Sequence, residues 1–151
     1  MATGEGSHLT RIQRTPTWLT GQASNYGHRL VTERLAAAGT RGYHYRLLSA
    51  LAEFGPASQA TLGRRTGIDR SDVVAALNEL TAAKLVERAP DPADRRRNII
   101  TLTEEGRNHL KRIDPVLDEI QDEFLAPLSD SEREQLTELL TKIVNYHSSR
   151  R

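Results

Sequence analysis

The fold of this chain is decided by residues 58–102, which read SQATLGRRTGIDRSDVVAALNELTAAKLVERAPDPADRRRNIITL. The first half of this stretch predicts two short helices joined by a tight turn. Ser58 is a suitable N-cap for the first helix, and Gly67 ends it because glycine readily adopts the left-handed conformation of a helix terminus. Asp69 is predicted to cap the second helix, with Asp72 three residues later in the capping-box position.

The second half of the stretch predicts a β-hairpin with a basic tip. Residues 84–88 and 98–102 have the composition of short strands, and the segment between them is rich in Pro and Asp, as in loops. That loop carries Arg95, Arg96 and Arg97. Two helices around a tight turn, followed at once by a basic hairpin, indicate a winged helix-turn-helix. In that motif the second helix can lie in the major groove of DNA, and the hairpin, or wing, can meet the backbone or the minor groove.

Outside this stretch the sequence predicts only helices. Apolar residues recur at helical spacing over residues 17–39, 47–54, 103–124 and 129–144. Residues 1–16 are rich in Gly, Ser and Thr without a hydrophobic period, so we expect a flexible N-terminal arm there. The predicted fold is therefore mainly α with a small β-hairpin wing, as one domain over residues 17–151.

Composition narrows the class of protein further. The chain has 151 residues, of which 37% are hydrophobic and 5% aromatic, so we expect a partner subunit to help bury its apolar surface. The absence of cysteine excludes disulfides and thiolate metal sites. The net charge of +1 hides a polarity, because residues 41–102 hold 10 basic and 7 acidic residues whereas residues 103–151 hold 7 and 11. Without a long apolar run, we expect a cytoplasmic protein with no membrane partner.

At the level of whole motifs the sequence resembles the MarR family of bacterial transcription regulators. The matching residues are Leu62-Gly63, Leu85-Val86-Glu87-Arg88, Asp91-Pro92-Ala93-Asp94-Arg95-Arg96 and Ile99-Ile100-Thr101-Leu102-Thr103-Glu104-Glu105-Gly106. The similarity extends over roughly residues 17–147 and includes one helix before the winged motif and two after it.

The resemblance implies a transcriptional regulator, most simply a repressor, that binds double-stranded DNA as an interlocked helical homodimer. Residues 17–40 and 103–148 would form the dimerisation lobe, and residues 41–102 the DNA-binding lobe. The operator is then expected to be a pseudo-palindrome with half-sites about 10 base pairs apart. A protein–protein adaptor that has lost DNA binding is an alternative, because the second motif helix has few cations.

The candidate DNA contacts lie on the motif helices and the wing. They are Ser58, Gln59, Arg70, Ser71, Asp72, Ala75, Asn78, Arg95, Arg96 and Arg97. The family often carries a basic residue where this chain has Ala93, so Arg95 becomes the candidate probe of the minor groove, with Arg96 held by Asp94 or Asp91. Asp72 is equally explained as the capping partner of Asp69.

Two further roles are suggested near the junction of the lobes. The family typically binds small aromatic or phenolic acids there, and rings and cations that could hold a carboxylate are available at Trp18, Tyr26, His28, Tyr43, His44 and Arg46. The same aromatic residues are equally explained by packing. A zinc-responsive regulator is an alternative through His28, His44 and His109, but no His-x3-His pair supports it, and we favour no metal and no cofactor. No catalytic motif is present, so we do not expect an enzyme.

Overall fold

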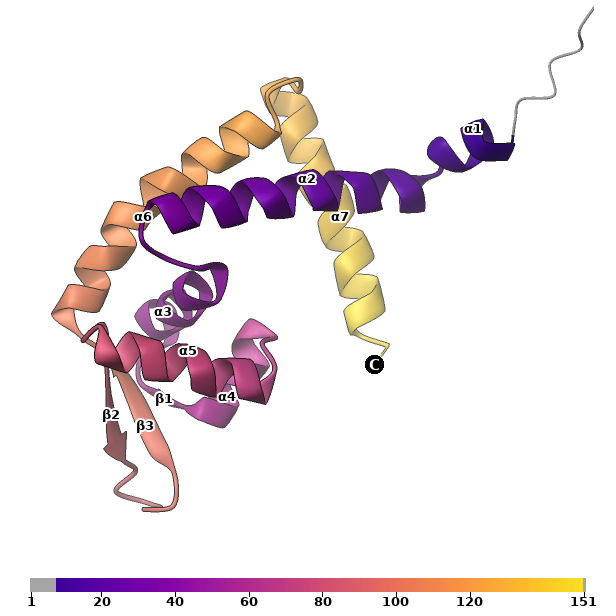
Figure 1. Cartoon of the computed structure of the whole chain (residues 1–151). Coiled ribbons are helices and arrows are strands. Elements are labelled where there is room, and N and C mark those ends of the chain that lie inside the picture. Colours follow the sequence, from indigo (N-terminus) through magenta and orange to yellow (C-terminus); the bar gives the residue numbers. More distant parts are fainter. Residues whose placement is uncertain (1–7, 151) are drawn as a thin grey trace, which may run out of the picture.

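The computed structural model describes residues 8–150 as a mainly helical chain with one small antiparallel sheet, which confirms the predicted fold class (Figure 1). In chain order the elements are α1 (His8–Gln13), α2 (Pro16–Ala37), α3 (Gly42–Phe54), β1 (Ala57–Ser58), α4 (Gln59–Thr66), α5 (Arg70–Ala82), β2 (Val86–Pro90), β3 (Asn98–Leu102), α6 (Glu104–Phe124) and α7 (Asp130–Ser148). None of the described helices combines the length and apolar character needed to span a membrane.

The sheet has the order β1-β3-β2, and all its pairs are antiparallel. Strand β1 escapes prediction because its two residues are too few for an alternating pattern, and it exists by pairing Ala57 with Ile100 of β3. The predicted strand at residues 84–88 begins later, at Val86, because Lys84 adopts a left-handed φ of 61° that is incompatible with a strand.

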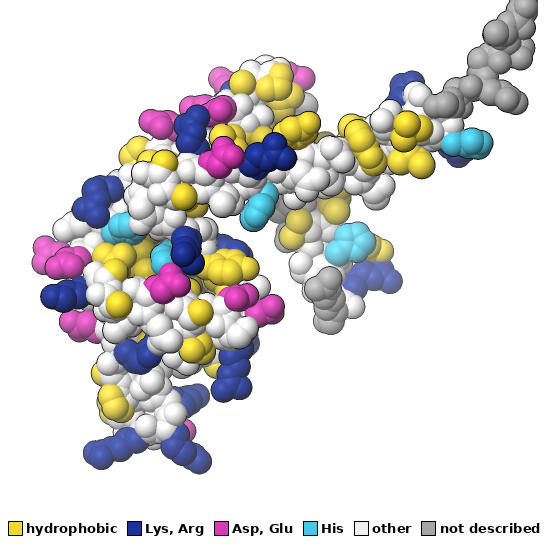
Figure 2. All heavy atoms as spheres, in the orientation of Figure 1, with side chains coloured by type: hydrophobic (Ala, Val, Ile, Leu, Met, Phe, Trp, Pro, Cys, Tyr) yellow, Lys and Arg dark blue, Asp and Glu magenta, His cyan; other side chains and the backbone are white. Residues whose placement is uncertain are grey.

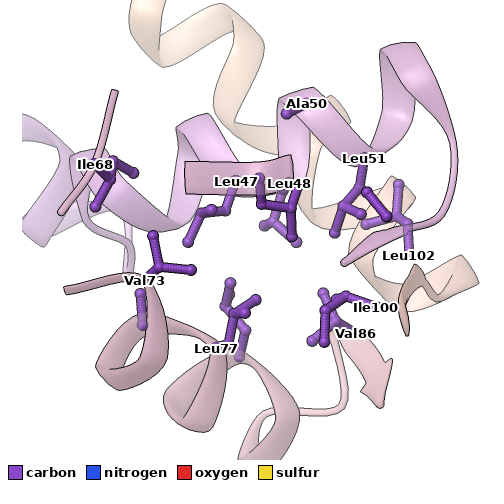
Figure 3. Close-up of a cluster of buried hydrophobic side chains, with 14 of the residues drawn as sticks. Leu47, Leu48, Ala50, Leu51, Ile68, Val73, Leu77, Val86, Ile100 and Leu102 are labelled. Carbon is purple, nitrogen blue, oxygen red and sulfur yellow. The ribbon is translucent and has the colours of Figure 1, made fainter. Parts of the chain in front are cut away.

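The motif helices and the sheet enclose one hydrophobic core (Figure 3). Leu47, Leu48 and Leu51 of α3 meet Leu77 of α5 and Ile100 of β3, and all five are at most 1% exposed. Burying a side chain of this size contributes about 1.5–3 kcal/mol each. The helix-turn-helix and the wing therefore form one rigid unit.

Helix α6 is attached to the root of the wing by its first turn. The Thr103 hydroxyl donates to the Lys84 carbonyl at 2.8 Å and accepts from the Gly106 amide at 3.0 Å. A Cβ at Gly106 would lie 2.2 Å from the Leu85 carbonyl oxygen, so the helix can approach this closely only with glycine there. Gly63 is different: a Cβ there would lie 3.5 Å from the Ile68 carbonyl oxygen, an ordinary van der Waals contact, so the crossing of α4 and α5 leaves room for an alanine.

We call the elements from α3 to β3 the winged unit. Beyond it, α2 packs along α6, and α7 folds back from the end of α6 (Figure 1). The buried residues between α2 and α6 are Leu35, Ile113 and Ile120, and an ion pair joins Arg34 to Glu123. No residue of α7 is buried. The two lobes thus differ sharply in how much apolar surface they enclose.

The ends of three helices test the predicted caps. Thr103 caps α6, and Ser129 caps α7 in a full capping box with Glu132. Asp69 stands at the N-cap of α5 but makes no side-chain capping bond, so the predicted box with Asp72 does not form.

The expected N-terminal arm contains a short helix, α1, over His8–Gln13, which the sequence did not predict. The helix buries nothing, and its two large apolar residues, Leu9 and Ile12, are 62% and 52% exposed. Two apolar positions are too few to give a recognisable hydrophobic period. Residues 1–7 of the predicted arm lie outside the described residues.

Candidate nucleic-acid interface

The turn between α4 and α5 is fixed at both ends by local geometry. The Ser58 hydroxyl accepts from the Thr61 amide at 3.2 Å and so caps α4 as predicted. Gly67 ends the helix in the left-handed region with φ of 69°, and its amide donates to the Gly63 carbonyl. Ile68 and Val73 are buried directly after the turn, which locks α5 against α4.

Helix α5 presents a narrow face of small side chains to solvent. Its buried residues Val73, Ala76, Leu77 and Leu80 define one side of the helix. On the opposite side lie three predicted contact residues, all exposed: Ser71, Ala75 and Asn78. Because these side chains are short, the helix backbone can approach a partner surface closely. Of the other predicted contacts on α5, Arg70 is exposed and Asp72 is half-buried.

The wing tip is shaped by two aspartates. The Asp94 carboxylate accepts from the Arg96 amide at 3.1 Å and from its Nε at 3.3 Å, which agrees with one of the two predicted partners of Arg96. Asp91 accepts from the Ala93 amide at 2.9 Å, and its second oxygen lies 3.5 Å from Nη2 of Arg97. The aspartates therefore order the loop and orient two guanidinium groups.

Arg95 differs from its two neighbours. It is exposed, and it makes no hydrogen bond or ion pair with any of residues 8–150. Figure 2 shows basic side chains gathered at the tip of the wing, at the bottom of the view. At the wing tip, Arg96 and Arg97 are thus oriented by aspartates, whereas the Arg95 side chain is exposed without such a partner in the described part of the chain.

A groove of about 680 Å³ lies between α4, the start of α5 and the wing. Its polar lining consists of Ser58, Gln59, Arg64, Arg70, Arg96, Arg97 and Asn98. Four guanidinium groups on one concave surface attract anions, and arginine matches the geometry of phosphate oxygens particularly well. The groove therefore brings together five of the ten predicted contacts, Ser58, Gln59, Arg70, Arg96 and Arg97.

The two arginines at the end of α4 separate into different roles. Arg64 donates to the Thr61 hydroxyl at 3.1 Å and lines the groove. The guanidinium of Arg65 stacks over the ring of Phe54 at 4.7 Å, away from the groove-lining set. Of the two, only Arg64 therefore contributes to the groove.

The residues predicted to hold a small effector divide into two groups. On α3, Arg46 stacks over the Tyr43 ring at 5.1 Å and donates to the Thr66 carbonyl, while His44 lies 2.8 Å from Glu79 of α5. The other group lies along α2 and comprises Trp18, which is half-buried, and Tyr26 and His28, which are exposed. A pocket that joins both groups stays a prediction.

The histidines predicted as alternative zinc ligands have separate surroundings. His28 lies on α2 beside a shallow hollow, and His44 pairs with Glu79. His109 is buried on α6, where Arg112 lies 3.4 Å from Nδ1; burial first, then the charges of Arg112 and His44, lower its pKa. Within residues 8–150, no three His, Asp or Glu side chains are grouped closely enough to hold a metal ion.

Two contacts that sequence reasoning missed join different elements. Arg88 of β2 donates to the Oδ1 atom of Asn78 at 3.1 Å and so reaches the exposed face of α5. The Tyr45 hydroxyl donates to Asp114 of α6 at 2.7 Å, and burial together with this carboxylate raises the pKa of Tyr45. The alternation of Val86 and Arg88 on one face of β2 was a sequence signal for the first contact.

Comparison with known proteins agrees with this geometry. Residues 39–97 match the model of the MarR family. The chain is also 32% identical over 101 residues to the transcriptional regulator HosA of Escherichia coli O111:H-, a match that covers 67% of this chain and 75% of HosA. The chain belongs to the MarR family.

Other MarR-family relatives are transcriptional regulators too. The repressor NicR of Pseudomonas putida is 36% identical over 98 residues, which cover 65% of this chain and 62% of NicR, slightly less than two thirds of that protein. Among solved structures, Bordetella bronchiseptica BpsR, whose DNA binding is regulated by 6-hydroxynicotinic acid, superposes with a TM-score of 0.79 at 26% identity, over 87% of this chain and 94% of BpsR.

Proposed function

We propose that this chain is a sequence-specific DNA-binding repressor of transcription that acts as a homodimer on a pseudo-palindromic operator. The observation that carries the proposal is the groove that Arg64, Arg70, Arg96 and Arg97 line beside the exposed face of α5. That arrangement offers cations to the phosphates and a narrow helix to the major groove of the same duplex.

In this proposal the wing and the helix have different tasks. Arg96 and Arg97, oriented by Asp94 and Asp91, contact backbone phosphates. Arg95, free at the tip, enters the minor groove. Ser71, Ala75 and Asn78 face base edges in the major groove, assisted by Ser58 and Gln59 at the start of α4.

The dimer is inferred from apolar side chains that one copy leaves uncovered. On α7 the exposed fractions are 58% for Leu139, 54% for Ile143 and 59% for Val144, and Leu19 of α2 is 49% exposed. Several large apolar side chains exposed along one helix, as on α7, are typical of a protein interface. We infer that residues 17–40 and 103–148 form the dimerisation lobe, which leaves residues 41–102 to bind DNA.

The proposal extends to a small effector. BpsR responds to 6-hydroxynicotinic acid, and the related Streptomyces coelicolor PcaV was solved with its natural ligand. We infer that an aromatic carboxylic acid binds between the lobes of this protein, with Tyr43, Arg46 and residues of α2 as its partners. Binding there would change the separation of the two α5 helices and release the operator.

The test is binding of the purified chain to DNA from upstream of its own gene, against scrambled DNA of equal length. We expect sequence-dependent binding at about 100 mM salt, with half-sites about 10 base pairs apart. Arg95→Ala should weaken binding to every sequence and lower the slope of log K against log salt by about one unit. Arg29→Ala, a change of an exposed arginine on α2, is the matched control and should leave the slope unchanged.

Equal binding to both DNAs would overturn the proposal and favour the adaptor alternative. If the Arg95→Ala protein has the same slope of log K against log salt as the wild type, Arg95 at the wing tip does not contact DNA. That result would leave the proposed role of α5 unaffected. Addition of 6-hydroxynicotinic acid tests the effector separately, because binding to DNA without any response to the acid contradicts only that part.

A further inference from the structure

Asn78 is the one amide side chain on the outward face of α5. It lies two helical turns after Ser71 and one turn after Ala75, opposite the buried residues Leu77 and Leu80. Ser71 carries a short hydroxyl and Ala75 only a methyl group. If α5 reads bases, Asn78 therefore offers the longest polar reach from this face.

Arg88 reaches Asn78 from the strand that leads into the wing. Residues alternate along β2, so Val86 and Arg88 point to the side of the sheet that α5 covers, while Glu87 and Ala89 point away and are exposed. Nη2 of Arg88 lies 3.1 Å from Oδ1 of Asn78. The contact thus joins α5 to β2, the first strand of the wing.

The position of Arg88 is not explained by stability. Its Nε atom is buried and has no hydrogen-bond partner among residues 8–150. An unsatisfied buried donor destabilises a fold, so a side chain held in this way points to a role besides packing. Its guanidinium donates to the Asn78 side chain, and this hydrogen bond is the feature to explain.

The chemistry of guanidinium fixes which way the Asn78 amide turns. Arginine carries five N–H donors and no acceptor, so only the amide oxygen can face Arg88. The NH2 group of Asn78 must then point elsewhere, and no residue among 8–150 accepts from it. The exposed side chain therefore presents two donors outward and keeps its oxygen turned toward the protein.

We propose that Arg88 is a positioning residue for sequence recognition: it holds Asn78 as a donor that selects a guanine edge and rejects adenine in each half-site. Guanine displays two adjacent acceptors, N7 and O6, in the major groove, whereas adenine places an N6–H2 donor beside its N7. An asparagine that reads adenine needs its oxygen to accept from that donor. With the oxygen engaged by Arg88, the adenine contact loses half of its hydrogen bonds.

This inference rests on the proposed DNA binding, and one experiment separates the two. Wild-type protein is used to select from a randomised duplex library, and each base pair of the enriched site is then substituted singly. We expect one G·C pair per half-site that is preferred over A·T by about tenfold, the factor that corresponds to roughly 1.4 kcal/mol. Asn78→Ala should abolish the preference at that pair alone.

Arg88→Met keeps a side chain of similar length without donors, and it frees the Asn78 amide to turn. The same pair should then show no preference for guanine or a preference for adenine, with the salt slope lowered by less than one unit. Arg88→Lys, which retains a donor, should keep the guanine preference. Ser71→Ala is the matched control on the same face and should alter a different base pair only.

The contrary outcomes are distinct. If wild-type protein enriches no sequence, the proposed function fails and this inference with it. If a site is enriched but Arg88→Met leaves the guanine preference intact in a protein with an unchanged circular dichroism spectrum, the positioning role is wrong. If Arg88→Met lowers the salt slope by one unit and leaves all preferences intact, Arg88 is a phosphate contact instead.

Discussion

The winged unit from α3 to β3 and the helix α7 differ in how far they bury their apolar residues. In the winged unit, leucines such as Leu47 and Leu62 are completely buried among three helices and a sheet. In α7, Leu139 and Ile143 are more than half exposed, although the helix is long and well capped. The winged unit thus has a core of its own, whereas we predict that α7 is covered by a second copy, as in the proposed homodimer.

The largest expected effect comes from Gly106, where the winged unit meets α6. Gly106→Ala places a methyl group 2.2 Å from the Leu85 carbonyl oxygen, so the helix must move away from the wing root. We expect a loss of at least about 3 kcal/mol in the free energy of unfolding, measured with urea, at the upper end for overpacked sites. Gly63→Ala is the control, and its change should stay within about 1 kcal/mol. Equal losses for both would mean that the close approach of α6 does not limit stability.

A second prediction tests the comparison directly with two truncations. Leu77→Ala removes a fully buried side chain and should cost about 3 kcal/mol at every protein concentration. Ile143→Ala removes a side chain that is 54% exposed in one copy and should shift the monomer–dimer equilibrium, as measured by sedimentation. A cost for Ile143→Ala that is large and independent of concentration would show that α7 is covered within its own chain.

The smallest effect concerns pH and the buried His109. Because burial and the charges of Arg112 and His44 lower its pKa, the folded state favours neutral histidine, and Nδ1 can accept from Arg112. The unfolded chain titrates near about 6.5, so the stabilisation is present above that pH and is lost as pH falls through the lower folded pKa. We expect unfolding in urea to be easier at pH 5.5 than at pH 7.5, and His109→Leu to reduce the difference. His147→Leu, at an exposed position, should not, and an unaltered pH dependence in the His109→Leu protein would contradict this account.

How much of this could be read from the sequence depends on whether a feature is local. The cap at Ser58, the left-handed Gly67 and the cap at Thr103 follow from residue types at fixed spacings, and the structure has all three. Strand β1 depends on a partner more than 40 residues away along the chain. Asp69 has the residue type of a cap, but its side chain makes no capping bond. Local patterns specify helix ends well and distant pairings poorly.

The candidate site divides along the same line. The hydrogen bond from Arg96 to the Asp94 carboxylate joins residues two apart in the sequence, so it could be expected from the wing sequence alone. The contact between Arg88 and Asn78 joins a strand to a helix and needs the fold before it can be seen. The roles of these residues on DNA stay predictions until the binding experiments are done.

The attachment of α6 to the wing root has a mechanical consequence. Thr103 and Gly106 fix the first turn of α6 to the backbone at Lys84 and Leu85, so this end cannot pivot freely. With 21 residues, the helix is a lever about 32 Å long. A tilt of about 5° at its far end then carries the wing root through roughly 3 Å, close to the ~3.4 Å rise of one base pair. In the proposed dimer on DNA, a small rotation of the dimerisation lobe would therefore displace the wing by about one base-pair step.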